Sequence, residues 1–322
     1  MRLRTLIFVL LFVLPPALKP WVLRVCCRAQ VGRNVHIGWF ASLMGRQICL
    51  GDYCEVRSLT LIRCDGAIEI ERYALVSSFT LVYGAAGLYL GEHSYIGPQC
   101  LINAEEEVRI GNWSALGARC MVYTHGSFLP FTEGYWVRFG PVTIGNQVWC
   151  AAGVFLQPGT TVGDSSFVNS CSVVSGLLPP GSVAEGNPAQ IVGEMARMRR
   201  PMSPRRLDAA VAQMLRHFSA IILTRGLGLT VCEKGDTLQF RHAGHAYRIA
   251  IAGAHQPTPA EVAHVGRTIW LVCRPNWRPS ISTLWLDLDR KLMTKARDQI
   301  YLELALFLKR YYGVQLEYYE ES

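Results

Sequence analysis

The feature that most constrains the fold of this chain is a six-residue repeat that runs from residue 31 to about residue 192. Each unit begins with an aliphatic residue and a glycine and carries a small residue at its fifth position, as at 31–36, 50–55, 96–101, 110–115 and 116–121. A short repeat of this kind is typical of a solenoid, in which stacked coils bury one continuous core. The repeat therefore predicts a parallel β-helix.

A longer period shows how the repeats are grouped into coils. An aliphatic residue recurs every twenty positions, and another precedes each of them by two positions, at Leu50, Ile70, Leu90 and Ile110. Alternate residues of a strand face the same side, so each pair predicts a short strand with two inward side chains. The spacing falls to eighteen, or three hexapeptides, between Ile144 and Val162. We therefore expect three six-residue faces in each coil, with two extra residues at one corner of the twenty-residue coils.

The regular spacing is interrupted between Ile110 and Ile144, which stand thirty-four residues apart instead of twenty. About fourteen residues are therefore inserted, and they fall within 126–140. Loops that leave a rigid scaffold often carry function. His125 lies at the root of this insertion, and the near-neutral pKa of imidazole suits a general base. From placement alone, a histidine that only ends a strand explains the position equally well.

In combination, these motifs make the chain resemble the left-handed β-helix acyltransferases of the hexapeptide-repeat family. The resemblance covers roughly half of the chain and is sharpest over 123–192, in the segments 124–127, 144–149, 158–159, 162–164 and 186–189. It implies a mainly β fold, a homotrimer with its active sites between subunits, and acetyl-CoA or another acyl-CoA as co-substrate.

The same resemblance implies an active site. His125 would take the proton of an acceptor hydroxyl while that oxygen attacks an acyl thioester. Ala152 would supply a backbone N–H to the oxyanion, although residues 151–153 also fit a plain corner of small residues. A carboxylate or carbonyl would orient the imidazole, and Glu133 in the insertion is preferred to the acidic run 105–107. An asparagine that some relatives use at an earlier coil has only Asn103 as its nearest counterpart here.

Further residues would bind the co-substrate if the resemblance holds. The pantetheine path would be lined by Trp149, Ala152, Pro158, Gly159, Gly186, Asn187 and Pro188. Arg197 belongs to an arginine cluster over 197–206, and arginine binds phosphate through paired hydrogen bonds. The coenzyme A phosphates are therefore one ligand for this cluster. A solvated linker and a lipid headgroup contact are the alternatives.

The net charge of +8 is concentrated at the two ends of the chain. Residues 1–28 carry five basic residues and no acid, and residues 197–322 carry nineteen basic against eleven acidic residues. The repeat region between them, 29–196, has eight arginines against thirteen acids. Basic ends suit a membrane surface or a phosphate-bearing ligand. No zinc-finger, RRM or KH signature points to a nucleic-acid partner.

The chain opens with an apolar run from Thr5 to Leu14, which ends at Pro15 and Pro16. This run is shorter than the roughly 20 residues that a membrane-spanning helix needs. No small-residue cleavage site follows it, which argues against a signal peptide. A short apolar helix followed by Trp21 and Arg24 predicts a peripheral anchor at a membrane surface. Docking of residues 5–18 against protein, a signal peptide and a true membrane anchor are the alternatives.

Eleven cysteines raise the question of disulfides or metal ligands. Cys54, Cys100 and Cys120 occupy the small fifth position of the repeat, which alanine or serine fills in sister repeats. Free cysteine behaves as a small buried hydrophobe, so these positions predict core packing and free thiols in a reducing, cytoplasmic compartment. Cys26 and Cys27 fit either ordinary thiols or an acylation site. The histidines of the coils are widely separated, so no metal site is expected.

The chain is predicted to contain an apolar and basic segment at 1–28, the β-helix domain at 29–195 and a C-terminal α+β domain of unknown role at 196–322. Within the last, helices are predicted at 207–223 and 290–311, and strands at 229–232, 237–241, 247–251, 268–273, 282–288 and 314–318. The expected function is acyl-CoA-dependent O-acyl transfer, most simply O-acetyl transfer, to a saccharide or glycolipid at the inner face of the cytoplasmic membrane. A catalytically silent scaffold for polysaccharide assembly and an N-acyltransferase of an amino sugar are the alternatives.

Overall fold

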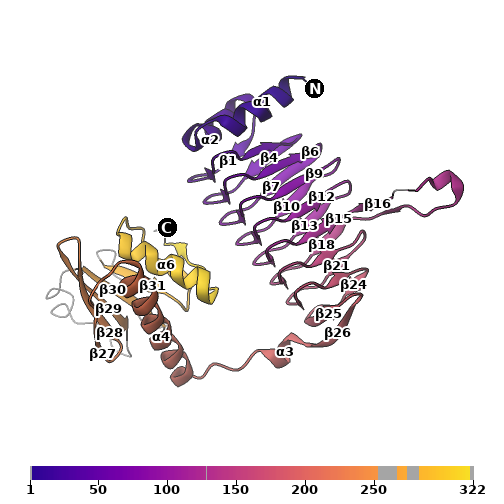
Figure 1. The fold of residues 1–322 in the computed structure, drawn as a ribbon. Coiled ribbons are helices and arrows are strands. Elements are labelled where there is room, and N and C mark those ends of the chain that lie inside the picture. Colours follow the sequence, from indigo (N-terminus) through magenta and orange to yellow (C-terminus); the bar gives the residue numbers. More distant parts are fainter. Residues whose placement is uncertain (1, 128, 253–266, 274–282, 320–322) are drawn as a thin grey trace. The chain divides into compact units, whose positions relative to one another are not determined.

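The computed structural model describes residues 2–127, 129–252, 267–273 and 283–319 (Figure 1). The chain forms two compact units, which divide between Arg200 and Pro201. The assignment of separate roles to 1–28, 29–195 and 196–322 remains a prediction.

The first unit is built mainly from three sheets of parallel strands. Successive strands along the coil belong to the first, the second and the third sheet in turn. The first sheet contains β1 (Gln30–Val31), β4 (Gln47–Leu50), β7 (Ala67–Ile70), β10 (Leu88–Leu90), β13 (Val108–Ile110), β18 (Val142–Ile144), β21 (Thr161–Val162) and β24 (Leu177–Leu178). The second contains β2 (His36–Ile37), β5 (Glu55–Val56), β8 (Leu75–Val76), β11 (Tyr95–Ile96), β14 (Ala115–Leu116), β19 (Trp149–Cys150), β22 (Phe167–Val168) and β25 (Ser182–Gly186), closed by the antiparallel β26 (Ala189–Glu194). The third contains β3 (Ser42–Met44), β6 (Leu61–Cys64), β9 (Leu81–Gly84), β12 (Leu101–Asn103), β15 (Met121–Tyr123), β20 (Phe155–Leu156) and β23 (Val173–Val174).

The strand register follows the period of the sequence. Ile70 pairs with Leu90, and Ile110 pairs with Ile144 across the inserted residues. The inward side chains of successive coils stack into one core, in which Ile70, Leu90 and Ile110 are buried. The predicted left-handed parallel β-helix of hexapeptide repeats is confirmed.

The corner that holds the extra residues can be identified from the buried positions. The intervals from Leu90 to Ile96 and from Ile96 to Ile102 are six residues, but the interval from Ile102 to Ile110 is eight. The two extra residues therefore lie at the third corner, between the third sheet and the first. The fourteen-residue insertion leaves the coil from this same corner, between β15 and β18. Adding residues there lengthens a turn without changing the spacing of the strands.

The first corner (between the first and second sheets) and the second corner (between the second and third) turn through left-handed residues. In each coil from 47 to 176 these residues stand six positions apart, as Tyr73 and Phe79 do, with φ of 57° and 62°. A side chain in this conformation costs roughly 1–2 kcal/mol. At the first corner the rings of Tyr53, Tyr73, His93 and Trp113 stack on one another, which contributes favourable contacts in return.

The N-terminal end of the coil is covered by a helical cap, which consists of α1 (Arg2–Val13), η1 (Pro16–Leu18) and α2 (Lys19–Cys26). Leu11 and Leu23 are buried in the core of the β-helix. Lys19 is also buried, and its Nζ donates to the carbonyl oxygens of Gly38 and Ala41, at 2.7 Å each. One face of the cap therefore packs against protein, which is the docking alternative and not the predicted peripheral anchor. No helix in the described part of the chain is long and apolar enough to cross a membrane.

The cysteines pack as the repeat predicts. Cys54, Cys100 and Cys120 are buried, and all eleven cysteines of the chain are free thiols. Burial raises the pKa of the Cys54 thiol to about 12, so this group stays protonated and apolar. The cytoplasmic location remains a prediction.

The second unit is an α+β domain, and its described residues form a mixed sheet of seven strands. Its elements are α4 (Pro204–Phe218), the π-helical η3 (Ser219–Gly226), β27 (Cys232–Lys234), β28 (Thr237–His242), β29 (His245–Ala252), β30 (Arg267–Val272), β31 (Leu284–Asp287), β32 (Leu292–Met293), α6 (Gln299–Tyr312) and β33 (Glu317–Tyr318). The short α3 (Met195–Met198) belongs to the first unit.

Most strands of this domain lie where the sequence predicts them, but several boundaries differ, and the strand expected at 314–318 begins only at Glu317. The strand expected at 229–232 begins at Cys232, and Ser282, at the start of another, lies outside the described residues. The helix expected from Arg290 begins only at Gln299. Residues 292–293 instead form β32, and Asp298 starts the helix, because its Oδ1 accepts the N–H of Tyr301 at 3.0 Å.

Candidate active site

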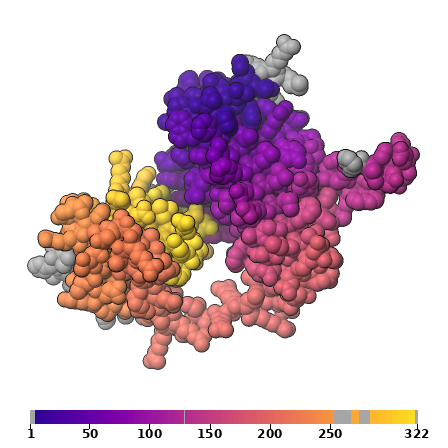
Figure 2. Space-filling view, in the orientation of Figure 1, coloured from indigo at the N-terminus to yellow at the C-terminus, as the bar shows by residue number. Residues whose placement is uncertain are grey.

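His125 lies at the root of an arm that stands out from the coil (Figures 1 and 2). The arm is residues 125–140; β16 (His125–Gly126) and β17 (Arg138–Phe139) form an antiparallel pair at its root, and η2 (Phe131–Glu133) lies farther out. Gly140 donates to the Thr124 carbonyl at 3.0 Å and accepts from the Gly159 N–H at 3.1 Å. These two bonds fasten the arm to its own coil and to the next one.

The imidazole of His125 is held from two sides. Its Nε2 lies 2.9 Å from the hydroxyl oxygen of Ser127. Its ring stacks on Phe139, with 4.3 Å between the ring centroids and 28° between the planes. The half-buried ring is thereby oriented, with Nε2 directed at a hydroxyl group. Neither Ser127 nor Phe139 is predicted from the sequence, because both contacts depend on how the arm folds back across its root.

The expected carboxylate partner does not reach His125 within one chain. Glu133 is exposed on η2, and the described residues show no contact between its carboxylate and the imidazole. In the acidic run, Glu107 pairs with Arg109, and the Glu106 N–H donates to the Thr124 hydroxyl at 2.9 Å. Within one chain, the hydrogen-bond partner of the imidazole is therefore the Ser127 hydroxyl and not the expected carboxylate or carbonyl.

Asn103 lies one coil before the arm and is closely connected to its root. It is buried on β12, opposite Tyr123, and its carbonyl oxygen accepts from the Thr124 hydroxyl at 2.9 Å. Its side-chain oxygen is buried and has no hydrogen-bond partner among the described residues. Buried polar atoms are rarely left without a partner, so this oxygen is available to a bound group.

Ala152 presents an unused backbone N–H at the second corner. At the first corner, side chains of the next coil accept such N–H groups, as Asp52 does for Arg33 at 2.7 Å and Asn112 for Glu92 at 2.8 Å. The Ala152 N–H has no acceptor in the described part of the chain, and the residue is exposed. The corner therefore carries a free donor of the kind that stabilises an oxyanion.

The remaining predicted residues fall into separate groups. Trp149 is exposed on β19, beside the Ala152 corner, with its ring 5.0 Å from that of Phe167. Pro158 and Gly159 lie at the third corner, where Gly159 is bonded to the root of the arm. Ala152 and His125 thus occupy different corners of the coil, and one chain alone does not bring them together.

The other two groups lie near the end of the coils. Gly186, Asn187 and Pro188 are exposed in the turn between β25 and β26. Arg197 is exposed on α3, and its Nε lies 3.5 Å from the carboxylate of Glu194. Among the described residues, no cluster of three or more His, Cys, Asp or Glu side chains is arranged to hold a metal ion.

Comparison with known proteins finds similar sequences in short segments. The galactoside O-acetyltransferase of Escherichia coli K12 is 42% identical over 55 residues, which are 17% of this chain and 27% of that protein. The WcaF protein of the same strain, assigned as an acetyltransferase of colanic acid biosynthesis, is 36% identical over 69 residues, or 21% of this chain and 38% of WcaF. The match thus spans well under half of either relative. No family model matches the chain.

Solved structures of low sequence identity also align with the chain. A hexapeptide-repeat acetyltransferase from Vibrio cholerae aligns over 60% of this chain and 87% of its own, with 19% identity and a TM-score of 0.37. A maltose O-acetyltransferase from Clostridium difficile 630 aligns over 59% of this chain and 83% of its own, with 21% identity and a TM-score of 0.35. In its repeats and in these matched segments, the chain is similar to hexapeptide-repeat acetyltransferases.

Proposed function

We propose that this protein is an acetyl-CoA-dependent O-acetyltransferase that acts on a saccharide or glycolipid, with His125 as its general base. The observation that carries the proposal is the Ser127 hydroxyl oxygen, 2.9 Å from His125 Nε2. It shows that a hydroxyl group can approach the imidazole at the distance that proton transfer needs. The similarity to a galactoside O-acetyltransferase supports a sugar as the acceptor.

The proposed reaction is a single displacement. The unprotonated Nε2 of His125 accepts the proton of the acceptor hydroxyl, whose oxygen forms a bond to the thioester carbonyl carbon. The carbon–sulfur bond then breaks, and the leaving thiolate takes the proton from the imidazolium. The products are an O-acetyl ester and the free thiol of coenzyme A. Phe139 orients the ring, and the acceptor hydroxyl takes the place of the Ser127 hydroxyl at Nε2.

The separation of His125 from Ala152 favours a site shared between two copies of the chain. The arm exposes large apolar side chains, namely Leu129, Phe131, Tyr135, Trp136 and Phe139. Exposed apolar groups of this number are typical of a protein interface. We infer a homotrimer in which the arm of one copy lies against the second corner of another, so that the Ala152 N–H of one subunit faces the His125 of its neighbour.

The co-substrate is proposed to lie along the second corner. Trp149 would contact the pantetheine there, and the small side chain at Ala152 allows a thioester to approach the backbone. Pro158, Gly159 and residues 186–188 would extend this path. Arg197 is the weakest member of the set, because its guanidinium is already paired with Glu194 and would have to exchange that carboxylate for a phosphate.

We also propose that the acceptor is met at the inner face of the cytoplasmic membrane. The free thiols of the chain suit a reducing compartment. A glycolipid acceptor would place the reaction at a membrane surface, but a dissolved saccharide would serve the same chemistry.

The experiment is a thiol-release assay with the full-length protein, acetyl-CoA and a set of mono-, oligo- and lipid-linked saccharides. His125→Ala should lower turnover by about 10²- to 10⁴-fold, because it removes the proton acceptor. The matched control is His36→Ala, an exposed histidine on β2, which should leave turnover unchanged. Thiol release by His125→Ala at the wild-type rate would exclude this histidine as the base.

The alternatives give different results in the same assay. A silent scaffold predicts neither thiol release nor binding of acetyl-CoA. An N-acyltransferase predicts release only with amino sugars, and mass spectrometry after mild base would show an alkali-stable amide instead of a labile ester.

A further inference from the structure

The outer face of the helical cap is apolar although no part of the described chain covers it. Ile7 and Leu11 of α1, and Leu14 just after it, pack against the β-helix core. The large side chains of the cap that point away are Leu6, Val9, Leu10, Val13, Leu18, Trp21 and Val25, each 46% to 65% exposed. A helix that is apolar all round requires apolar surroundings on both sides. The coil supplies them on one side only.

The cap and the coil that it covers carry basic side chains and no acidic ones. Residues 1–51 contain no aspartate or glutamate, and the first acid of the chain is Asp52. Arg24 is held by the first coil, since its guanidinium donates to the carbonyl oxygens of Val31 and Gly32. Arg28 and Arg46 are exposed and have no ion-pair partner among the described residues. Two guanidinium groups are therefore free to meet anions.

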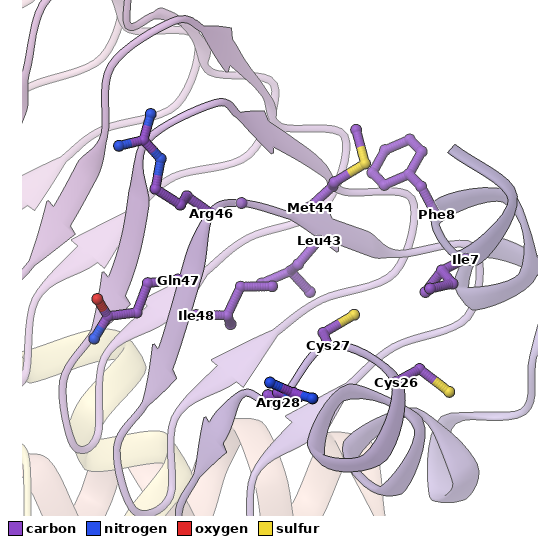
Figure 3. A pocket seen from close by; sticks show the side chains of 11 residues that line it. Ile7, Phe8, Cys26, Cys27, Arg28, Leu43, Met44, Arg46, Gln47 and Ile48 are labelled. Atoms are coloured by element: carbon purple, nitrogen blue, oxygen red, sulfur yellow. The ribbon is translucent and has the colours of Figure 1, made fainter. Parts of the chain in front are cut away.

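These two arginines border a cavity of about 330 Å³ at the seam between the cap and the first coil (Figure 3). Ile7 and Phe8 of α1 line it from one side, and Leu43 and Ile48 line it from the coil. Figure 3 shows the apolar side chains and both arginines around the same space. An apolar cavity bordered by cations suits an amphiphile with an anionic head.

We propose that the helical cap docks on a bilayer of anionic phospholipid, with its exposed apolar side chains among the acyl chains and with Arg28 and Arg46 on lipid phosphates. At about 1.5 Å per residue, the 12 residues of α1 span only ~18 Å, so the helix lies in the interface and does not cross it. Trp21 has the amphipathic ring that favours this depth. A second copy of the chain suits the face less well, because two caps would bring arginines together without an acid between them.

The test is co-sedimentation of the full-length protein with vesicles of phosphatidylcholine, with and without phosphatidylglycerol. Trp21→Ser should weaken binding by about tenfold or more, because a large buried apolar group is lost from the bilayer. The matched control is Phe79→Ser on a coil corner, since Phe79 is 59% exposed and Trp21 is 60% exposed. The control should bind as the wild type does.

The charge is tested separately. The double change Arg28→Gln and Arg46→Gln should weaken binding to phosphatidylglycerol vesicles by about 30-fold, at roughly 1 kcal/mol for each arginine. Arg63→Gln, at an exposed arginine of β6, is the control. Vesicles of phosphatidylcholine alone should bind the wild type and the double variant equally weakly.

Three results would overturn the proposal. The first is equal vesicle binding by Trp21→Ser and Phe79→Ser. The second is binding that ignores the lipid charge. The third is a smaller particle mass for Trp21→Ser in the absence of lipid, which would show that a second copy covers the face. This proposal does not rest on acetyl transfer: loss of thiol release with intact vesicle binding would count only against the proposed function, and the reverse result only against the membrane surface.

Discussion

The backbone N–H of Ala152 is the part of the proposed site that a single substitution can remove most cleanly. The strand register places Leu116 opposite Cys150 and Ile96 opposite Leu116, so Pro98, Ala118 and Ala152 occupy the same corner position in successive coils. Pro98 therefore shows that this position accepts a proline ring. Ala152→Pro would delete the N–H, which no other group in the described chain uses, and would preserve the shape of the corner.

The magnitude follows from this geometry. Because no internal hydrogen bond is lost and the backbone is already compatible with proline, stability should change by no more than about 1 kcal/mol in the stabilising direction. Loss of one oxyanion donor should lower kcat by about 10²- to 10³-fold, which corresponds to about 2.7–4 kcal/mol. The free energy of unfolding and the rate would thus change in opposite directions.

The assay is thiol release under saturating acetyl-CoA, combined with calorimetric measurement of acetyl-CoA binding and of thermal unfolding. Ala118→Pro is the matched control, since it makes the same change at the same corner one coil earlier and should leave kcat unaltered. An Ala152→Pro protein that is folded, binds acetyl-CoA and turns over at the wild-type rate would refute the role of this N–H. A loss of acetyl-CoA binding would instead show that the proline ring blocks the thioester.

Three further predictions concern assembly and stability. Light scattering should give the mass of a trimer, and Trp136→Ser on the exposed part of the arm should reduce it; a monomeric wild type would contradict the shared site. Asp298→Ala should lower the hydrogen-exchange protection of α6 by about 30- to 1,000-fold, or about 2–4 kcal/mol, because α6 loses its N-cap and the Tyr247 hydroxyl loses its acceptor. The control Asp289→Ala, at an exposed aspartate, should leave this protection unchanged. Burial lowers the pKa of Lys19 from 10.5 to about 8, so the unfolded state binds more protons than the folded state between these pH values. Docking of the cap should therefore become more stable as the pH rises from 8 to 10.5. Resistance of α1 to proteolysis measures this stability, and Lys19→Met should abolish its pH dependence.

The sequence alone predicts the coil, because the repeat determines both the buried side chains of each strand and the positions of the corners. Alternation within a strand selects the buried side chains, and the intervals of six and eight residues fix the corners. The same intervals place the insertion at a corner, and the position of His125 at its root follows. The burial of Cys54, Cys100 and Cys120 is predictable for the same reason, since the fifth position of the unit favours a small side chain.

Contacts that depend on the folding back of a segment are decided only in three dimensions. Phe139 meets His125 because two short strands pair across the arm, and no periodicity marks that register. Glu133 is preferred from the sequence on charge alone, but the arm holds it on an exposed turn. Likewise, the free N–H of Ala152 depends on whether the next coil offers an acceptor, as Asp52 does at the first corner and as no described residue does for Ala152.

The N-terminal helix α1 shows most simply what the sequence determines and what only the tertiary structure decides. Its sequence is apolar on every side, so it determines a helix that avoids water but not which face is buried. The open end of the coil makes that choice by packing Leu11, while Leu10 remains outside. The hydrophobic effect has no preferred direction, so the shape of the surface against which the helix packs decides which of its side chains are buried.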